Sequence, residues 1–364
     1  MVSAPKVVVD ARESPEPRGS LPHWGWLATG LVIGAGLAVL VLRPGAPEDA
    51  VTSTTAGAEA GVVLGGIAET IDGFPDGLVA VTRGDGQSLE LLIWPIRGEP
   101  IERTIPVGVS RPPDAVDFDV SGRRIATLLP VPDHADGVLY AGVPQDAAII
   151  ATDVTGYAWH DSDASQLAYT TFVDDELQLW AVHQGNGEPG LVTRAVGIDG
   201  HVEAWGDWGF AIQDDARDNI VLFTDTGEIK DTNIGRILDS DGTGWLAIDN
   251  QGVSLLSSGG GVRGLQMEGL EGQLLAGRFS DDGQWLALLS SEEVQVVHVE
   301  DGATPVASDG RPGVPQLAWS SDGRFVAYPG SRGIWVLDTA TGNTEEILAN
   351  RTFTGLEMLP LDDS

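Results

Sequence analysis

The apolar residues of the chain follow two different patterns. Residues 24–42 form an uninterrupted apolar run, WGWLATGLVIGAGLAVLVL, without a charged side chain. From about residue 66 onward, short apolar stretches alternate with turns rich in Gly and Asp. The first pattern is typical of a membrane-spanning helix, and the second is typical of buried strands bounded by turns. The sequence therefore predicts one transmembrane α-helix followed by an all-β domain.

The short apolar stretches recur at a regular spacing. Seven of them carry a central alanine among larger residues, with successive gaps of 46, 42, 43, 36, 40 and 40 residues. These alanines are Ala80, Ala126, Ala168, Ala211, Ala247, Ala287 and Ala327. A period of about 40–45 residues is typical of the four-stranded blade of a β-propeller. We expect a seven-bladed propeller, with six or eight blades as alternatives.

The residues around the alanines fit the same architecture. Five of the alanines follow an aromatic residue at a distance of six to nine positions; the aromatic residues are Phe118, Trp159, Trp205, Phe279 and Trp319. Asp282-Gly283 and Asp322-Gly323 predict tight hairpin turns, because glycine tolerates a positive φ. An unpaired strand edge invites aggregation, so a terminal segment should close the ring beside the first blade. Either 352–359 or 62–67 is suited to this role.

Three segments carry the same phrase in which a polar turn separates two strands. They are WSSDGRFVAY (319–328), FSDDGQWLALL (279–289) and FDVSGRRIATL (118–128). The phrase resembles the WD40-like repeat of TolB-type propellers, and related repeats occur in the propeller of prolyl oligopeptidases. The resemblance extends over most of residues 66–349, and the proline that usually precedes the Asp-Gly turn is absent. It implies a propeller and, for a TolB-like chain, a non-catalytic role with a protein partner. It implies no peptidase activity, because the sequence contains no hydrolase motif.

The apolar run predicts how the chain is placed at a membrane. A helix of this length spans about 28 Å, close to the hydrocarbon thickness of a bilayer. Lys6, Arg12 and Arg18 precede the run and only Arg43 follows closely, so we expect the N-terminus in the cytoplasm and the β domain outside. No small-residue cleavage motif follows, which favours an uncleaved signal-anchor over a cleaved signal peptide.

Four regions result from these patterns. They are a disordered cytoplasmic tail (1–22), a transmembrane signal-anchor helix (23–43), a flexible linker (44–61) and the β-propeller (62–364). Gly30 and Gly34 form a GxxxG pair that would allow two anchors to associate, so the oligomeric state stays open.

Charge and composition exclude several functions. The chain has 54 acids against 20 bases, a formal net charge of −34. Such a surface repels phosphate backbones, so we expect no nucleic-acid partner. The absence of cysteine excludes disulfides, thiol catalysis and Cys-ligated zinc.

Candidate catalytic and metal-binding residues are few. The sequence has no nucleophile elbow, phosphate-binding loop or HExxH motif. The segment 239–244 begins like a calcium loop, but Thr243 and Asn250 stand at positions that need acids, so a blade turn explains it better. Asp residues beside other turns are expected to be solvated; they are Asp161, Asp163, Asp174, Asp175, Asp281 and Asp282. Six histidines are scattered along the chain (His23, His134, His160, His183, His201 and His298), and of these only His160 and His298 are candidates to face a central channel. We predict no catalytic, cofactor-binding or metal-binding residues and no cofactor, and the binding face stays undetermined.

Two functions are compatible with this architecture. The first is a non-catalytic scaffold or sensor module that is held at the membrane through residues 24–42 and binds a protein or cell-envelope partner. The alternative is a propeller enzyme that acts on carbohydrate or a small ligand in the central funnel. An enzyme should gather ionisable residues from several blades at one mouth of the channel, with mutually perturbed pKa values. An interaction module should instead present a broad loop face with exposed aromatic residues or charge of one sign.

Overall fold

The structure is a computed structural model. It describes Ile67 and residues 71–359, apart from gaps at 84–87, 98, 108–112, 114, 120, 131–135, 145, 175, 184–187, 208, 225–228, 233, 241–243, 250–251, 258–260, 266, 268–269, 301–306 and 310–313. The predicted tail (1–22), anchor helix (23–43) and linker (44–61) lie outside the described residues. Within those residues, no helix has the length and apolar character needed to cross a membrane.

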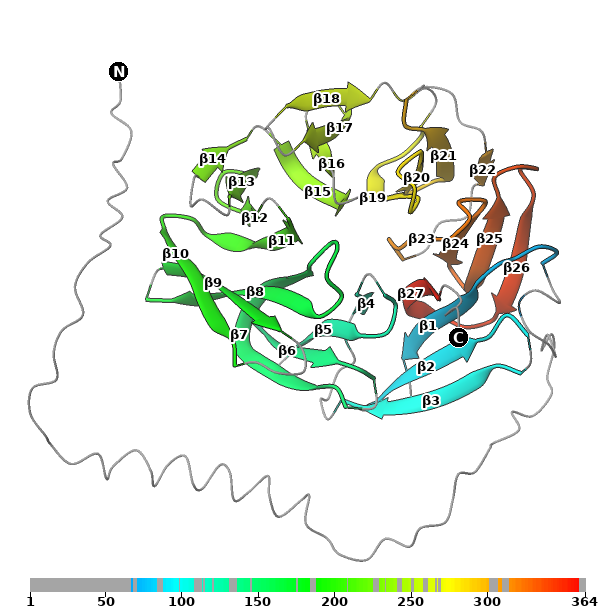
Figure 1. The fold of residues 1–364 in the computed structure, drawn as a ribbon, viewed down its shortest axis with the longest axis horizontal. Helices are drawn as coiled ribbons and strands as arrows, with labels where there is room; N and C mark the ends of the chain where they lie inside the picture. The colour runs from blue at the N-terminus through cyan, green and yellow to red at the C-terminus, as the bar shows by residue number, and fades with distance from the viewer. Residues whose placement is uncertain are drawn as a thin grey trace, which may run out of the picture. The chain divides into compact units, whose positions relative to one another are not determined.

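The regular elements of the described region are all strands, which confirms the all-β prediction (Figure 1). Five sheets have four antiparallel strands each, and one sheet has seven. The first sheet combines β1 (Gly77–Arg83), β2 (Ser88–Trp94) and β3 (Ile101–Pro106) with the last strand of the chain, β27 (Phe353–Leu359). The other four-stranded sheets use strands in sequence order: β11 (Gly200–Gly206), β12 (Gly209–Asp214), β13 (Asn219–Phe223) and β14 (Ile229–Asp231); β15 (Ile234–Ser240), β16 (Gly244–Asp249), β17 (Gly252–Ser257) and β18 (Val262–Leu265); β19 (Leu274–Phe279), β20 (Trp285–Ser290), β21 (Val294–His298) and β22 (Ala307–Asp309); β23 (Ala318–Trp319), β24 (Phe325–Gly330), β25 (Gly333–Asp338) and β26 (Thr344–Ala349).

The seven-stranded sheet is continuous because one long strand serves two neighbours. It runs β4 (Asp117–Phe118), β5 (Ile125–Pro130), β6 (Gly137–Gly142), β7 (Ala148–Trp159), β8 (Gln166–Val173), β9 (Glu176–His183) and β10 (Gly190–Val196). Strand β7 pairs with β6 from Ala148 to Val154 and with β8 from Val154 to Trp159. Asp153, at the change of partner, has φ 57°, a left-handed conformation that reorients the strand.

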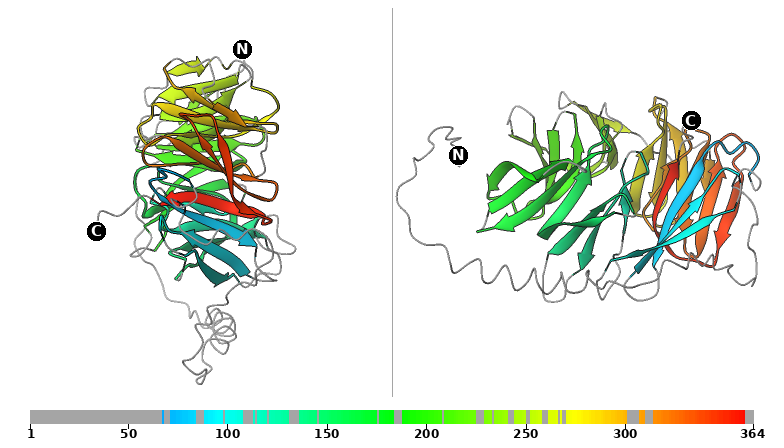
Figure 2. Two further views of the ribbon diagram at one scale, coloured as in Figure 1. Left: turned by 90° about the vertical axis from the view of Figure 1, so that its right-hand side faces the viewer. Right: turned by 60° about the horizontal axis from the view of Figure 1, so that its bottom comes forward.

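The sheets stand side by side in a ring around a common centre (Figure 1). The two ends of the β domain meet in the first sheet, because β27 pairs antiparallel with β1 over Gly77–Thr82 (Figure 2). Of the two closing segments that the sequence offered, 352–359 therefore supplies a strand. Of the other segment, 62–67, the structure describes only Ile67, which is fully buried and whose amide donates to the carbonyl of Pro95 over 3.1 Å.

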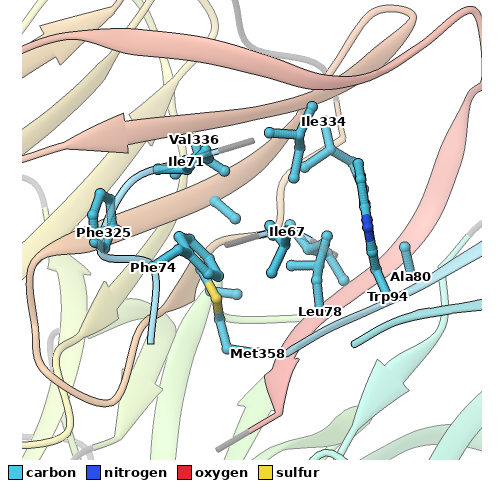
Figure 3. Packing of buried hydrophobic residues seen from close by; sticks show 14 of the residues in the cluster. Ile67, Ile71, Phe74, Leu78, Ala80, Trp94, Phe325, Ile334, Val336 and Met358 are labelled. Atoms are coloured by element: carbon cyan, nitrogen blue, oxygen red, sulfur yellow. The ribbon is translucent and has the colours of Figure 1, made fainter. Parts of the chain in front are cut away.

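The seven central alanines occupy the second strand of each repeat, and all are at most 1% exposed. With a side chain of one methyl group, each allows large residues of the neighbouring sheet to approach closely. The cluster between the first and last sheets shows the result: Phe74, Trp94, Phe325 and Met358 surround Ile67 (Figure 3). Burial of side chains of this size contributes about 1.5–3 kcal/mol each.

The predicted Asp-Gly turns form as expected. Gly283 and Gly323 have φ 66° and 68°. In both turns the serine two residues before the aspartate donates its hydroxyl to that aspartate over 2.7 Å, Ser280 to Asp282 and Ser320 to Asp322. These bonds hold the ends of the flanking strands in register at one rim of the ring.

Candidate functional site

A cavity of about 910 Å³ lies where the sheets face one another. It is lined by β4, the second half of β7, β11, β15, β19, β27 and the segment 315–317 that leads into β23. The first strand of each repeat thus contributes to the wall, as expected for the central channel of a ring of sheets. The wall brings together ionisable side chains that lie far apart in the sequence.

One ion pair on this wall joins β27, the strand that closes the ring, to β19 of another sheet. A guanidinium nitrogen of Arg278, on β19, lies 2.7 Å from a carboxylate oxygen of Glu357, on β27. The side chain of Glu357 is 9% exposed and that of Arg278 is 33% exposed, so the arginine keeps part of its surface in the cavity. Arg278 also donates to the carbonyl of Leu317 over 2.9 Å. A single guanidinium therefore ties together three segments of the wall.

The charge of Arg278 also acts on two further carboxylates, those of Asp239 and Asp281. Asp239, on β15, accepts the amide of Phe279 over 2.8 Å. Burial raises the pKa of Asp239 to about 6, although Arg278 acts in the opposite direction. Burial likewise raises the pKa of Glu357 and of Asp281, and Arg278 lowers both only in part. Three carboxylates thus share the charge of one guanidinium; of these Glu357 is buried, Asp239 is partly buried and Asp281 is exposed.

Elsewhere on the cavity wall, a tyrosine and an aspartate form a second pair. The hydroxyl of Tyr157, on β7, lies 2.5 Å from a carboxylate oxygen of Asp117, on β4, and donates to it. Asp117 is exposed to the cavity, and desolvation by the surrounding wall raises its pKa, although the bonds from Tyr157 and Gln316 and the charge of Arg278 oppose this shift. Burial and the adjacent carboxylate raise the pKa of Tyr157 well above its ordinary value. Tyr157 therefore stays protonated and serves as a hydrogen-bond donor at neutral pH.

His160, Asp161 and Asp207 form a group at the rim that resembles a metal site. The Nδ1 atom of His160, however, accepts the amides of Ser162 and Asp163, each over 3.2 Å. Because Nδ1 accepts, a ring proton lies on Nε2, which faces an oxygen of Asp207 over 3.7 Å. A metal ion needs a ring nitrogen with an available lone pair, so the histidine fits a turn-capping role better than a metal-ligating one. Ser280 and Ser320 cap the equivalent turns of later repeats.

The structure changes the interpretation of several candidate residues. Asp239 was expected in a blade turn but lies on β15 and lines the cavity. Asp161 was expected to be solvated, but its side chain is 4% exposed and accepts the hydroxyl of Ser240 over 2.6 Å. Asp281 is exposed as expected and also lines the cavity. Of the two candidate channel histidines, His160 lines the central cavity, whereas His298 lines a separate cavity and stacks edge-on against Trp285.

The other candidates are placed as follows. Asp163 accepts the hydroxyl of Ser165, and this bond and those from neighbouring groups lower its pKa. Asp282 also has a lowered pKa, because it accepts the hydroxyl of Ser280. Asp174 is exposed in a turn, and His183 lies within 2.9 Å of the hydroxyl of Ser165. His23, His134, Asp175, Thr243 and Asn250 lie outside the described residues.

Sequence reasoning missed most of the residues on the cavity wall. Arg278, Glu357, Asp117 and Tyr157 occur in unremarkable strand phrases. His201 was not singled out, yet it lines the cavity 3.4 Å from Glu203, and the bond to this glutamate raises its pKa. Their position in the repeat could have indicated them, since these residues lie on the first strand of a repeat or on the closing strand.

Comparison with known proteins identifies the fold of this chain. No family model and no curated protein sequence matches the chain. Among solved structures, TolB from Acinetobacter baumannii is similar with a TM-score of 0.50 and 14% identity over 81% of this chain and 70% of that one. The fold is a β-propeller. A functionally unknown protein from Desulfotomaculum acetoxidans DSM 771 is similar to this propeller with a TM-score of 0.52 and 11% identity, over 79% of this chain and 100% of that one. A protein from Lactobacillus plantarum has a TM-score of 0.50 and 12% identity, over 78% and 99%. At these identities the likeness establishes the propeller fold alone, and the cavity is its central channel.

Proposed function

We propose that this chain is a membrane-anchored, extracytoplasmic propeller of TolB-like type that binds its ligand in the central channel without transforming it. Seven blades are the best count, since β7 serves both as the last strand of one blade and the first of the next. On this count the wall of the channel has one segment from every blade. The likeness to TolB in fold supports the type, and the recurrent phrase of residues 319–328 supports it further.

The main support for a binding site in the channel is that ionisable side chains from several strands converge there. Asp117, Tyr157, Asp239, Arg278 and Glu357 come from five strands and meet around one cavity. Glu357 is buried, Tyr157, Asp239 and Arg278 are partly buried, and Asp117 is exposed to the cavity. Ionisable groups with perturbed environments that converge on one cavity are typical of binding sites. Among the described residues, the outer strands also expose a few large apolar side chains, including Ile101, Ile149 and the adjacent pair Leu191 and Val192 on β10. We therefore place the ligand in the channel.

The anchor rests on the sequence. The uncharged run at 24–42 and the basic residues before it support a cytoplasmic N-terminus and an exported propeller. In this location the natural ligand or partner belongs to the cell envelope or the medium.

The lack of cysteine makes the topology directly testable. Single cysteines are introduced as Ser3→Cys in the tail and Glu345→Cys on the exposed face of β26, and intact cells are treated with a membrane-impermeant maleimide. We expect labelling of the β26 cysteine at once and of the tail cysteine only after permeabilisation. The reverse pattern, or labelling of neither before permeabilisation, would exclude an extracytoplasmic propeller.

The binding site is tested with a channel variant and a matched surface variant. The full-length protein in detergent is titrated by calorimetry with a panel of choline, agmatine, spermidine, chitotriose and maltotriose. The channel variant is Asp239→Asn/Glu357→Gln, and the control is Glu345→Gln, an exposed acid on β26. We expect at least one ligand to bind the wild type and the control alike and to lose at least about tenfold in affinity in the channel variant, the effect of one lost charged hydrogen bond. Equal affinity in the wild type, the channel variant and the control would show that the ligand binds outside the channel.

A second function is favoured by one feature of the channel. The Asp117–Tyr157 pair and the raised pKa values of Asp117 and Asp239 form the kind of perturbed group that catalytic sites use. The alternative is an enzyme that acts on carbohydrate or a small ligand in the funnel. Turnover of a panel of nitrophenyl glycosides and lactones that is lost in Asp117→Asn would establish it, and absence of turnover by a protein that binds ligand would leave the binding role.

A further inference from the structure

We propose that the central channel binds a small organic cation. This inference rests on the proposed function, because it names the ligand class of the same site. The class follows from two features of the channel wall, its balance of charge and its aromatic side chains.

The wall carries more negative than positive charge. Only Arg236 and Arg278 supply fixed positive charge to the lining, against seven acidic residues: Asp117, Asp119, Asp161, Glu203, Asp239, Asp281 and Glu357. Some of these acids have local partners, since Asp119 pairs with Arg124 at 3.2 Å and Glu203 lies beside His201. Around Arg278, however, one guanidinium faces Glu357, Asp239 and Asp281. A bound cation would restore the balance, and its attraction to the partly buried Asp239 and the buried Glu357 is stronger than attraction between charges in bulk water.

The aromatic lining is independent of the acids. Phe118, Tyr157 and Trp159 line the cavity, and each is only partly buried. Trp205 lines it as well, but its ring is already stacked on Phe210 and packed against His160. The faces of aromatic rings attract alkylammonium and guanidinium groups through the ring quadrupole. Carboxylates beside aromatic rings form a lining that suits an organic cation, with charge on one side and apolar carbon on the other.

The same lining is poorly suited to other ligand classes. A hard metal ion prefers a shell of oxygen ligands and gains nothing from the aromatic side chains. The one candidate group with metal-like composition in the described region is His160, Asp161 and Asp207, whose histidine nitrogen is engaged by two backbone amides. An anion would meet seven acidic residues against two guanidinium groups, of which Arg278 is already paired to Glu357.

The test compares a cation with a neutral molecule of the same shape. Full-length protein is titrated by calorimetry with choline, agmatine and spermidine, and with 3,3-dimethylbutan-1-ol, which has the shape of choline and no charge. We expect at least one cation to bind in the millimolar range or tighter, and the neutral isostere of choline to bind at least about tenfold more weakly than choline or not at all. Calcium chloride, added in excess, should not displace the cation beyond the effect of matched ionic strength.

Two variants test whether binding depends on the acidic residues and on the aromatic side chains of the channel wall. Asp239→Asn and Trp159→Leu should each weaken cation binding about tenfold, while Glu345→Gln leaves it unchanged. Retention of the wild-type melting temperature checks that each variant is folded.

Several outcomes would overturn the cationic class. They are no binding of any cation, equal binding of the neutral isostere, displacement by calcium, or binding of a lysine-rich peptide where the free cations do not bind. If chitotriose or maltotriose binds and the affinity falls in Asp239→Asn/Glu357→Gln, the channel remains the ligand site and only the cationic class fails. If ligands bind but none depends on channel residues, the proposed function itself fails.

Discussion

Replacing Arg278 with methionine isolates the electrostatic arrangement of the channel. The change keeps most of the aliphatic stem and removes the charge that lies 2.7 Å from Glu357. Breaking a buried ion pair by removing one partner costs about 3–5 kcal/mol because a charge is left uncompensated. Arg278 is one third exposed, so solvent screening reduces the expected loss of unfolding free energy to about 2–3 kcal/mol.

The assay is urea unfolding of the full-length protein in detergent, followed by tryptophan fluorescence. Arg194→Met is the matched control, since this arginine is 57% exposed and lies 3.8 Å from Glu176; its loss should stay below about 1 kcal/mol. The double variant Arg278→Met/Glu357→Gln should recover a substantial part of the loss, because the orphaned charge is gone.

The pH dependence of this loss has a defined sign. Burial already raises the pKa of Glu357 and of Asp239 in the folded protein, and without Arg278 both rise further. A carboxyl group with a raised folded pKa contributes stability at low pH that is lost as pH rises through that pKa. The destabilisation of Arg278→Met should therefore shrink from neutral pH to below the value of about 6 given for Asp239. A loss equal to that of Arg194→Met, or one that does not shrink on acidification, would refute the shared-guanidinium arrangement.

Three further predictions concern closure, packing and binding. Phe353→Ala, at a fully buried position on the closing strand, should cost about 3–5 kcal/mol in urea unfolding, against less than about 1 kcal/mol for Val262→Ala, which is 54% exposed; similar losses would show that β27 does not close the ring. Gly206→Ala should lower the melting temperature, because a Cβ there would lie 2.3 Å from a carboxylate oxygen of Asp161, whereas Gly264→Ala, with no atom within 4 Å, should not; equal melting temperatures would contradict the packing at the rim. Cation affinity measured by calorimetry should fall about tenfold from about pH 7 to about pH 5, because protonation of Asp239, whose pKa is raised to about 6, removes the charge that attracts the ligand; a flat profile would exclude Asp239 from the site.

The repeat could be predicted from the sequence because it depends on local pattern. Ala126, Ala247 and Ala327 each sit at the centre of a buried strand, and burial on both faces leaves a continuous apolar phrase that is visible in the chain. Closure by 352–359 followed from the need to pair an open edge, although the sequence did not select it over 62–67. The continuity of β7 was not predicted, since it depends on a left-handed Asp153 that no turn motif marks.

The channel could not be predicted in the same way. Asp239, Arg278 and Glu357 belong to different repeats, and only the curvature of the ring brings them together. With 54 acids in the chain, no local feature separates the few that face the channel from those that face solvent. The anchor and its orientation lie outside the described residues and stay predictions.

Reactivity of a cysteine placed inside the channel tests the central claim most directly. Ala276→Cys puts the only thiol of the chain on the channel wall, and Ala349→Cys places it on the exposed end of β26. Each variant is treated with a methanethiosulfonate that carries trimethylammonium and with one that carries sulfonate. We predict that the ratio of cationic to anionic modification rates is at least about tenfold larger at position 276 than at position 349, and that Asp239→Asn reduces it. Equal ratios at the two positions, or a channel thiol that neither reagent reaches, would contradict an open channel that attracts cations.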